Sequence, residues 1–224
     1  MRKRVRFALI AIVVLGLILA AALYVVFRAS QQVPAFYTEA ISIPAQAQET
    51  ESDRMLTQIT ALHNELQGKG RWSQVFKAQT INGWLAVDLP RNHPTLLASG
   101  MHDPRVHIDP QGITMACQVD RGGLHAIVSL QISALVESDD VVGLRVHKAR
   151  LGAIPWSFRT VLDKIADAAR KSNVDIHWRQ TDGDPVALIK IPSPRGNRKQ
   201  IIHIETIRLE EGALVVAGTT EMAK

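Results

Sequence analysis

Hydrophobic positions divide the chain into one unbroken apolar run near the N-terminus and a longer part in which apolar and polar residues alternate. The run extends from Phe7 to Phe27 and contains 21 residues without a charged side chain. At about 1.5 Å per residue, a helix of this length spans about 31 Å, which matches a hydrocarbon core of about 30 Å. The pattern therefore predicts a single transmembrane helix over residues 7–27.

Basic residues surround this run unevenly, which predicts its orientation. Four of them lie in residues 1–6, whereas Arg28 alone follows the run before Glu39. Because Lys and Arg accumulate on the cytoplasmic side, we expect a cytoplasmic tail, an anchor in the inner (cytoplasmic) membrane and an extracytoplasmic remainder, in a periplasm or at the cell exterior. A cleaved signal peptide is the alternative, because Ala20–Ala22 supply small residues. Signal peptides usually carry only about 7–15 apolar residues, which favours an uncleaved anchor.

Residues 28–50 lack strong periodicity and are rich in Gln, Ala, Ser, Pro and Thr. Pro34 and Pro44 interrupt them further, so this segment is expected to be an extended stalk. The extracytoplasmic domain then occupies residues 51–224. It opens with Glu51–Gln67, where apolar residues at helical spacing predict an amphipathic helix that ends before Gly68.

The next two elements are a short strand over Trp72–Ala78 and an ambiguous segment over Gln79–Ser99. Asn82-Gly83 between apolar residues is typical of a β-hairpin. Apolar residues at helical spacing behind Thr80, a possible N-cap, favour a helix that Pro90 ends. We predict the helix and keep the hairpin as the alternative.

From Asp103 onward the apolar pattern has a period of two, which predicts an antiparallel meander. Its strands are expected over Val106–Asp109, Ile113–Val119, Leu124–Val136 and Val141–Arg150. In the third strand one face is apolar throughout, and the other carries His125, Ser129, Gln131 and Ser133. A strand of about 13 residues is long, so the sheet must curl to bury its apolar face.

The remaining elements complete an α+β fold. Ser157 is a plausible N-cap for a helix that runs to about Lys171. Further strands are expected over residues 174–179, 186–191, 201–209 and 213–218, with a polar, basic loop over 192–200. The predicted architecture is an N-terminal transmembrane helix followed by a curved antiparallel sheet packed with two or three amphipathic helices.

Charge and cysteine content exclude some classes of protein. Five of the 26 Lys and Arg residues lie at or before Arg28, so 26 − 5 = 21 basic residues face 21 acidic residues after it. The outer part is formally neutral, and nucleic acid is not an expected partner. Cys117 is the only cysteine, so no internal disulfide forms. In an apolar strand it is expected to be a small buried hydrophobe rather than a nucleophile.

Catalytic and metal-binding patterns do not stand out. The eight histidines form no recognised ligand spacing, and no nucleophile elbow, phosphate loop or dinucleotide fingerprint is present. Asp182-Gly183-Asp184 is better explained as a hairpin turn than as part of a calcium loop. We therefore expect no enzyme, metal or cofactor. Arg195, Arg198 and Lys199 form a basic loop that is either solvated or in contact with anionic lipid headgroups.

Three segments together resemble a known family: Phe76–Leu85, Val106–Val136 and Leu144–Pro155. Their order resembles the bacterial YpmS-like membrane-anchored proteins and, more distantly, the tubular lipid-binding (TULIP-like) domains. The resemblance covers roughly residues 74–191. It implies a highly curved antiparallel sheet wrapped against a long helix, with an apolar groove that takes acyl chains and no catalytic residue. Trp156 and the basic loop depart from the pattern and leave the groove size and the partner open.

The expected function is binding of lipid or another amphiphile beside the membrane. The candidate groove residues are apolar side chains of the predicted strands and helices: Trp84, Leu85, Val128, Leu130, Ile132, Trp156, Phe158 and Leu162. For each of them an ordinary closed core is the alternative. An envelope scaffold that binds another protein is the second hypothesis, and an enzyme with a polar pocket is the third.

Overall fold

The computed structural model describes residues 21, 24–25, 27–97, 99–121, 124–138, 141–157, 162–163, 166–167, 169–170, 176–190 and 200–222. Its helices are α2 (Ala35–Ile41), α3 (Ala45–Gln67), α4 (Ala78–Asn92) and the 3-10 helix η1 (Pro94–Leu96). Its strands are β1 (Gly70–Lys77), β2 (Met101–Asp109), β3 (Gly112–Arg121), β4 (Leu124–Ser138), β5 (Val141–Leu151), β6 (Ile154–Pro155), β7 (Ile176–Thr181), β8 (Asp184–Lys190), β9 (Gln200–Glu210) and β10 (Ala213–Met222). The α+β prediction is confirmed.

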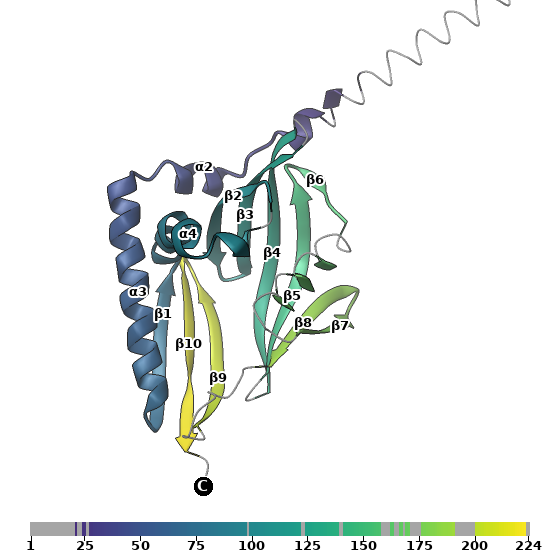
Figure 1. Ribbon diagram of the computed structural model, residues 1–224. Helices are drawn as coiled ribbons and strands as arrows, with labels where there is room; N and C mark the ends of the chain where they lie inside the picture. The colour runs from purple at the N-terminus through teal and green to yellow at the C-terminus, as the bar shows by residue number, and fades with distance from the viewer. Residues whose placement is uncertain are drawn as a thin grey trace, which may run out of the picture.

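The strands form two antiparallel sheets rather than the single sheet that was predicted (Figure 1). The larger has the order β2-β3-β4-β5-β8-β7, with β6 beside β5, and contains the predicted meander. The smaller has the order β1-β10-β9. The hairpin between β7 and β8 turns at Asp182 and Gly183, both with positive φ, so the turn prediction for this segment is confirmed.

The outer edge of β2 is capped, which explains why β9 and β10 do not extend the larger sheet. The Asn82 side chain donates to the Val106 carbonyl at 2.9 Å and accepts from the Val106 N–H at 2.7 Å. Two residues further along β2, the Ile108 carbonyl accepts a hydrogen bond from the Gly212 N–H at 2.9 Å. These bonds satisfy the strand edge without another strand, and they tie α4 and the β9–β10 turn to it.

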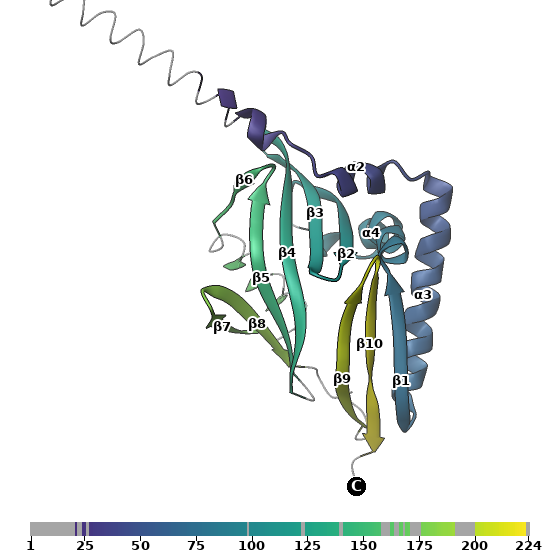
Figure 2. The same ribbon diagram turned by 180° about the vertical axis from the view of Figure 1, so that it is seen from behind.

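Asn82-Gly83 therefore lies inside α4, so the helix prediction is confirmed and the hairpin alternative is wrong. A Cβ atom at Gly83 would lie 2.5 Å from Glu51 Cβ and 2.7 Å from Ser52 N, so glycine permits the close approach of α3 and α4. In both views α4 lies between α3 and β2 (Figures 1 and 2). The predicted helix ends were wrong. The N-cap is Lys77, Thr80 instead donates to the buried Glu51 carboxylate at 3.1 Å, and the helix continues past Pro90.

The predicted extended stalk over residues 28–50 was wrong. Most of it is folded onto the domain: residues 27–30 are helical, α2 follows Pro34, and α3 begins after Pro44, six residues before its predicted start. Tyr37 is 1% exposed, donates its hydroxyl to the Asp103 carbonyl at 2.8 Å, and packs with Ala116 and Ile127. The two prolines are helix N-caps here, where their missing N–H removes no hydrogen bond.

Three predicted segments fall wholly or largely outside the described residues. They are the anchor over 7–27, of which residues 21, 24, 25 and 27 are described and helical, the loop over 192–200, and the helix over 157–171. In the last of these, residues 162, 163, 166, 167, 169 and 170 are described and helical. Within the described part of the chain, no helix combines the length and the apolar composition needed to cross a membrane.

Candidate functional site

Three of the predicted groove residues lie together on the apolar face of β4. Val128 and Ile132 are 8% and 7% exposed, and Leu130 between them is half-buried. In the sheet Leu130 is paired with Met115 of β3, which is 37% exposed, and with Ala149 of β5. The apolar face defined by these five residues is thus buried along part of its length and reaches solvent at β3.

The other groove candidates are dispersed. Trp84 and Leu85 lie half-buried on α4, outside this sheet face, and the Trp84 ring is 5.9 Å from the His93 ring. Trp156 follows β6, is half-buried, and donates its backbone N–H to the Ala149 carbonyl at 2.8 Å. Leu162 is half-buried. Phe158 and the basic residues Arg195, Arg198 and Lys199 lie outside the described residues.

Cys117 lies on the same apolar side of β3 and is half-buried. Burial raises the pKa of its thiol to about 11, so the thiol is neutral at physiological pH. A neutral thiol is a poor nucleophile. Cys117 therefore contributes packing rather than reactivity to this face.

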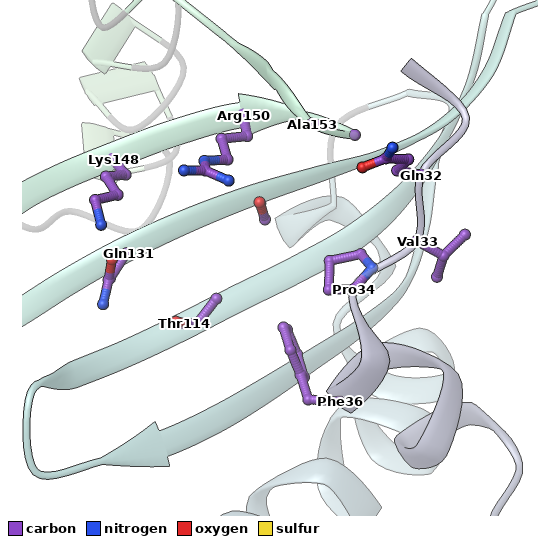
Figure 3. A pocket seen from close by; sticks show the side chains of 11 residues that line it. Gln32, Val33, Pro34, Phe36, Thr114, Gln131, Lys148, Arg150 and Ala153 are labelled. Carbon is purple, nitrogen blue, oxygen red and sulfur yellow. The ribbon is translucent and has the colours of Figure 1, made fainter. Parts of the chain in front are cut away.

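A polar pocket of about 330 Å³ lies on the opposite face of the same strands (Figure 3). Its floor consists of side chains from three adjacent strands: Thr114 of β3, Ser129 and Gln131 of β4, and Lys148 and Arg150 of β5. Register explains why they converge, because Thr114, Gln131 and Lys148 form one cross-strand row, and Ser129 and Arg150 belong to the next. Residues 32–34 and Phe36 form one wall, and Gly152 and Ala153 also line the pocket.

Backbone contacts fix the walls of this pocket to the sheet. The Gly152 N–H donates to the Ile127 carbonyl at 2.7 Å, and the Ala153 N–H donates to the Ala29 carbonyl at 2.8 Å. Gly152 has a φ of 58°, and a Cβ there would lie 2.4 Å from the Ser30 carbonyl oxygen, so only glycine fits. On the other side, Phe36 stacks on His107 with ring centroids 5.4 Å apart.

The charge of this pocket is not balanced by its own residues. Its lining includes Lys148 and Arg150 and no carboxylate. In the part of the chain that the structure describes, neither cation forms an ion pair. A larger pocket beside α3, about 650 Å³, is lined by two acidic and two basic residues, Glu51, Asp53, Arg54 and Lys77. Of these two pockets, which are formed by described residues, the first presents uncompensated positive charge and the second does not.

Ser133, His147 and Asp184 form a hydrogen-bonded chain across β4, β5 and β8. Ser133 Oγ lies 2.8 Å from His147 Nε2, and His147 Nδ1 lies 3.2 Å from Asp184 Oδ2, the atom order of a hydrolase triad. Arg145 Nε also donates to Asp184 at 2.9 Å. Ser133 lines neither the pocket of Figure 3 nor the one beside α3. These hydrogen bonds join the three neighbouring strands β4, β5 and β8.

A second polar cluster joins the ends of β2, β3 and β4. The His102 ring lies 2.8 Å from Asp103 and 2.7 Å from Asp120 through its two nitrogens, and His125 lies 2.6 Å from Asp120. Only an imidazolium donates from both nitrogens, so the two carboxylates raise the pKa of His102 above its usual value. The hydrogen bonds from His102 and His125 lower the pKa of Asp120 to about 2.

These shifts predict a pH window for the stability that the cluster contributes. The His102 contribution is complete below about pH 6.5 and disappears as the pH rises through its raised pKa. The Asp120 contribution is complete above about pH 4 and disappears as the pH falls towards 2. We therefore expect the difference in melting temperature between the parent protein and Asp120→Asn to be largest between about pH 4 and 6.5. Asp53→Asn on the exposed side of α3 is the control for the change in charge. A difference for Asp120→Asn that is constant from pH 3 to 9 would contradict the assignment.

Lys148, Arg150 and Gln32 were not predicted from the sequence to be site residues. A signal existed for the first two, because the period-two pattern of residues 141–150 places them on one face of the strand, and Ser129 and Gln131 were already on a predicted polar face. Gln32 carried no such signal, because its segment was predicted to be an extended stalk.

Comparisons with protein-family models, with curated proteins and with solved structures find no match for this chain. The resemblance to YpmS-like and TULIP-like proteins therefore stays a prediction.

Proposed function

We propose that the protein is a membrane-anchored, extracytoplasmic domain that binds lipid or another amphiphile on the apolar face of its larger sheet, without catalysing a reaction. The observation that carries this proposal is incomplete coverage of that face. Met115 is 37% exposed beside the half-buried Leu130, although both belong to central rows of the sheet. Exposed apolar surface next to buried core is where an acyl chain gains most from leaving water.

The N-terminal segment supports the membrane location in this proposal. The uncharged run over residues 7–27 is long enough to span a bilayer. Its described residues Tyr24, Val25 and Phe27 are 62%, 64% and 58% exposed, as side chains that face lipid would be. In both views, the segment that follows them lies at the end of the molecule opposite the C-terminal end of β10 (Figures 1 and 2).

The second candidate is an envelope scaffold that binds another protein. One observation favours it: Leu56 and Ile59 of α3 and Val75 of β1 are 41%, 42% and 43% exposed. Val75 belongs to the smaller sheet and Leu56 and Ile59 to the helix beside it, whereas the apolar face of β3–β5 belongs to the larger sheet. A protein partner on α3 and a lipid on β3–β5 would therefore respond to different substitutions.

Photo-crosslinking tests the lipid proposal on the full-length chain. We expect a photoreactive fatty acid to label peptides from β3 and β4 when the protein is held in phosphatidylcholine nanodiscs. Met115→Arg should reduce this labelling at least about fivefold, because a charged side chain is costly to bury against an acyl chain. The exposed position of Met115 lets the variant fold, and melting curves verify that it does.

Ala61→Arg on the exposed side of α3 is the matched control, because it adds the same charge away from the sheet. Labelling confined to residues 7–27 in the parent protein would contradict lipid binding by the domain. Equal labelling of the two variants would also contradict it, and would favour the scaffold candidate.

A further inference from the structure

We propose that the pocket of Figure 3 is a binding site for a phosphate-bearing anion, held by Lys148 and Arg150. This site is separate from the amphiphile site, because it lies on the opposite face of β3–β5. Anion binding in this pocket therefore does not depend on lipid binding by the apolar face. The charge, the hydrogen-bond donors and the shape of the pocket all suit such an anion.

The two cations are placed to act on one ligand. Lys148 and Arg150 are two residues apart in β5, so both side chains project from the same face. Figure 3 shows both extending over the neighbouring strand, towards the polar side chains of β4. Arg145, on the same strand, is instead paired with Asp184 and Asp182. Among the described residues, Lys148 and Arg150 thus form no ion pair, whereas Arg145 on the same side of the strand is neutralised.

Buried positive charge strengthens the field of the pocket. Arg105 is 4% exposed and occupies the same cross-strand row as Ala116, Ser129 and Arg150. Burial lowers its pKa, but arginine stays charged at any physiological pH. Its Nε is buried and has no hydrogen-bond acceptor among the described residues. An anion bound above β4 would lie about two strand spacings, or about 10 Å, from this buried cation, which is roughly one Debye length, so Arg105 adds a smaller attraction than Lys148 and Arg150 do.

The hydrogen-bond donors of the pocket, charged and neutral together, fit a phosphate better than a carboxylate. Arg150 offers a planar fork that matches two oxygens, and Lys148 offers a point charge for another. Hydroxyls of Thr114 and Ser129 and the side-chain amides of Gln32 and Gln131 surround them. This number of donors exceeds what the two oxygens of a carboxylate can use and suits the three or four oxygens of a phosphate.

The shape of the pocket leaves room for a substituent on that phosphate. Its volume of about 330 Å³ lies at the lower end of the usual range of about 300–1,000 Å³ for small-ligand sites. Val33, Pro34 and Phe36 provide an apolar wall beside the polar floor. A phospholipid headgroup and a soluble phosphate compound share this chemistry, and the wall belongs to the segment that follows the apolar run.

The test compares two double variants of the full-length chain in phosphatidylcholine nanodiscs. Lys148→Gln/Arg150→Gln removes both pocket cations, and Lys69→Gln/Arg71→Gln removes two exposed cations near the start of β1, so the change in net charge is identical. Equilibrium dialysis measures binding of inorganic phosphate, and co-sedimentation measures binding to vesicles that contain phosphatidic acid. We expect the pocket variant to bind at least about tenfold more weakly than the parent protein, and the control to stay within about twofold.

Each outcome decides a specific point. Loss of both phosphate and vesicle binding in the pocket variant supports a site that accepts lipid headgroups. Loss of phosphate binding alone, with vesicle binding unchanged, supports a site for a soluble phosphate compound. Equal losses in the two variants would show a general effect of charge and overturn the proposal. The proposal is also overturned if the parent protein binds neither inorganic phosphate nor the vesicles.

Discussion

Replacement of Gly83 by alanine is expected to lower the free energy of unfolding by about 3 kcal/mol. The new Cβ would lie 2.5 Å from Glu51 Cβ, 2.7 Å from Ser52 N and 2.8 Å from the Gln48 carbonyl oxygen. Two of these three atoms are backbone atoms of α3, so no side-chain rotation relieves the overlap. The two helices must separate, and the Asn82 bonds to the edge of β2 are strained with them. Urea unfolding followed by circular dichroism measures the loss.

Gly68→Ala is the matched control, because Gly68 ends α3 with a negative φ and its Cβ would meet only the Glu65 carbonyl oxygen, at 3.5 Å. We expect its free energy of unfolding to change by less than about 0.5 kcal/mol. Equal changes in the two variants would show that the contact between α3 and α4 at Gly83 is not tight.

The Asn82-Gly83 pair shows how far local patterns predict this fold. The helical spacing of the residues around it predicted α4, and the dipeptide alone predicted a hairpin. Both residues are explained by contacts with distant segments, since Asn82 binds the β2 edge and Gly83 touches α3. A local pattern carries no information about such partners, and the two-sheet arrangement that follows from them was missed for the same reason.

The folding of residues 28–50 onto the domain was not predicted, because the residue that indicates it lies in another element, β4. α2 is short, and its apolar residues Phe36 and Tyr37 are too few to show helical periodicity. The complementary signal is Ile127, an apolar residue between His125 and Ser129 on the predicted polar face of β4. It is 7% exposed because Tyr37 packs against it. One apolar residue on a polar strand face indicated that something covers that face.

The same error explains why the pocket of Figure 3 was not predicted. Period-two alternation placed Val128, Leu130 and Ile132 on one face of β4, and the structure confirms that placement. For the opposite face only its polar residues were noted, and no element was predicted to lie over it. Folding of residues 32–36 against that face converts a row of polar side chains into a pocket, so the site depends on a segment that had been assigned to the stalk.

Tyr37 is buried beside Phe36, which lines that pocket, so we expect its replacement to affect both the stability of the domain and the pocket. Tyr37→Ala should lower the free energy of unfolding by about 3–5 kcal/mol, because it empties a fully buried aromatic position. In the parent protein, burial raises the pKa of Tyr37 to about 12, so its hydroxyl is protonated and donates to the Asp103 carbonyl. The alanine variant removes this donor. Denaturant unfolding and phosphate dialysis on the same preparations measure both effects.

Tyr37→Phe separates packing from the hydrogen bond. It keeps the ring between Ala116 and Ile127 and removes only the hydroxyl, so we expect a loss of about 1 kcal/mol and phosphate binding within about twofold of the parent protein. In Tyr37→Ala, α2 loses its anchor and Phe36 leaves the pocket wall, so phosphate binding should weaken at least about fivefold even where the protein remains folded. If Tyr37→Ala binds phosphate as well as Tyr37→Phe does, then α2 does not hold the wall in place. The floor of β3–β5 would in that case be sufficient for the anion, and binding would depend on Lys148 and Arg150 alone.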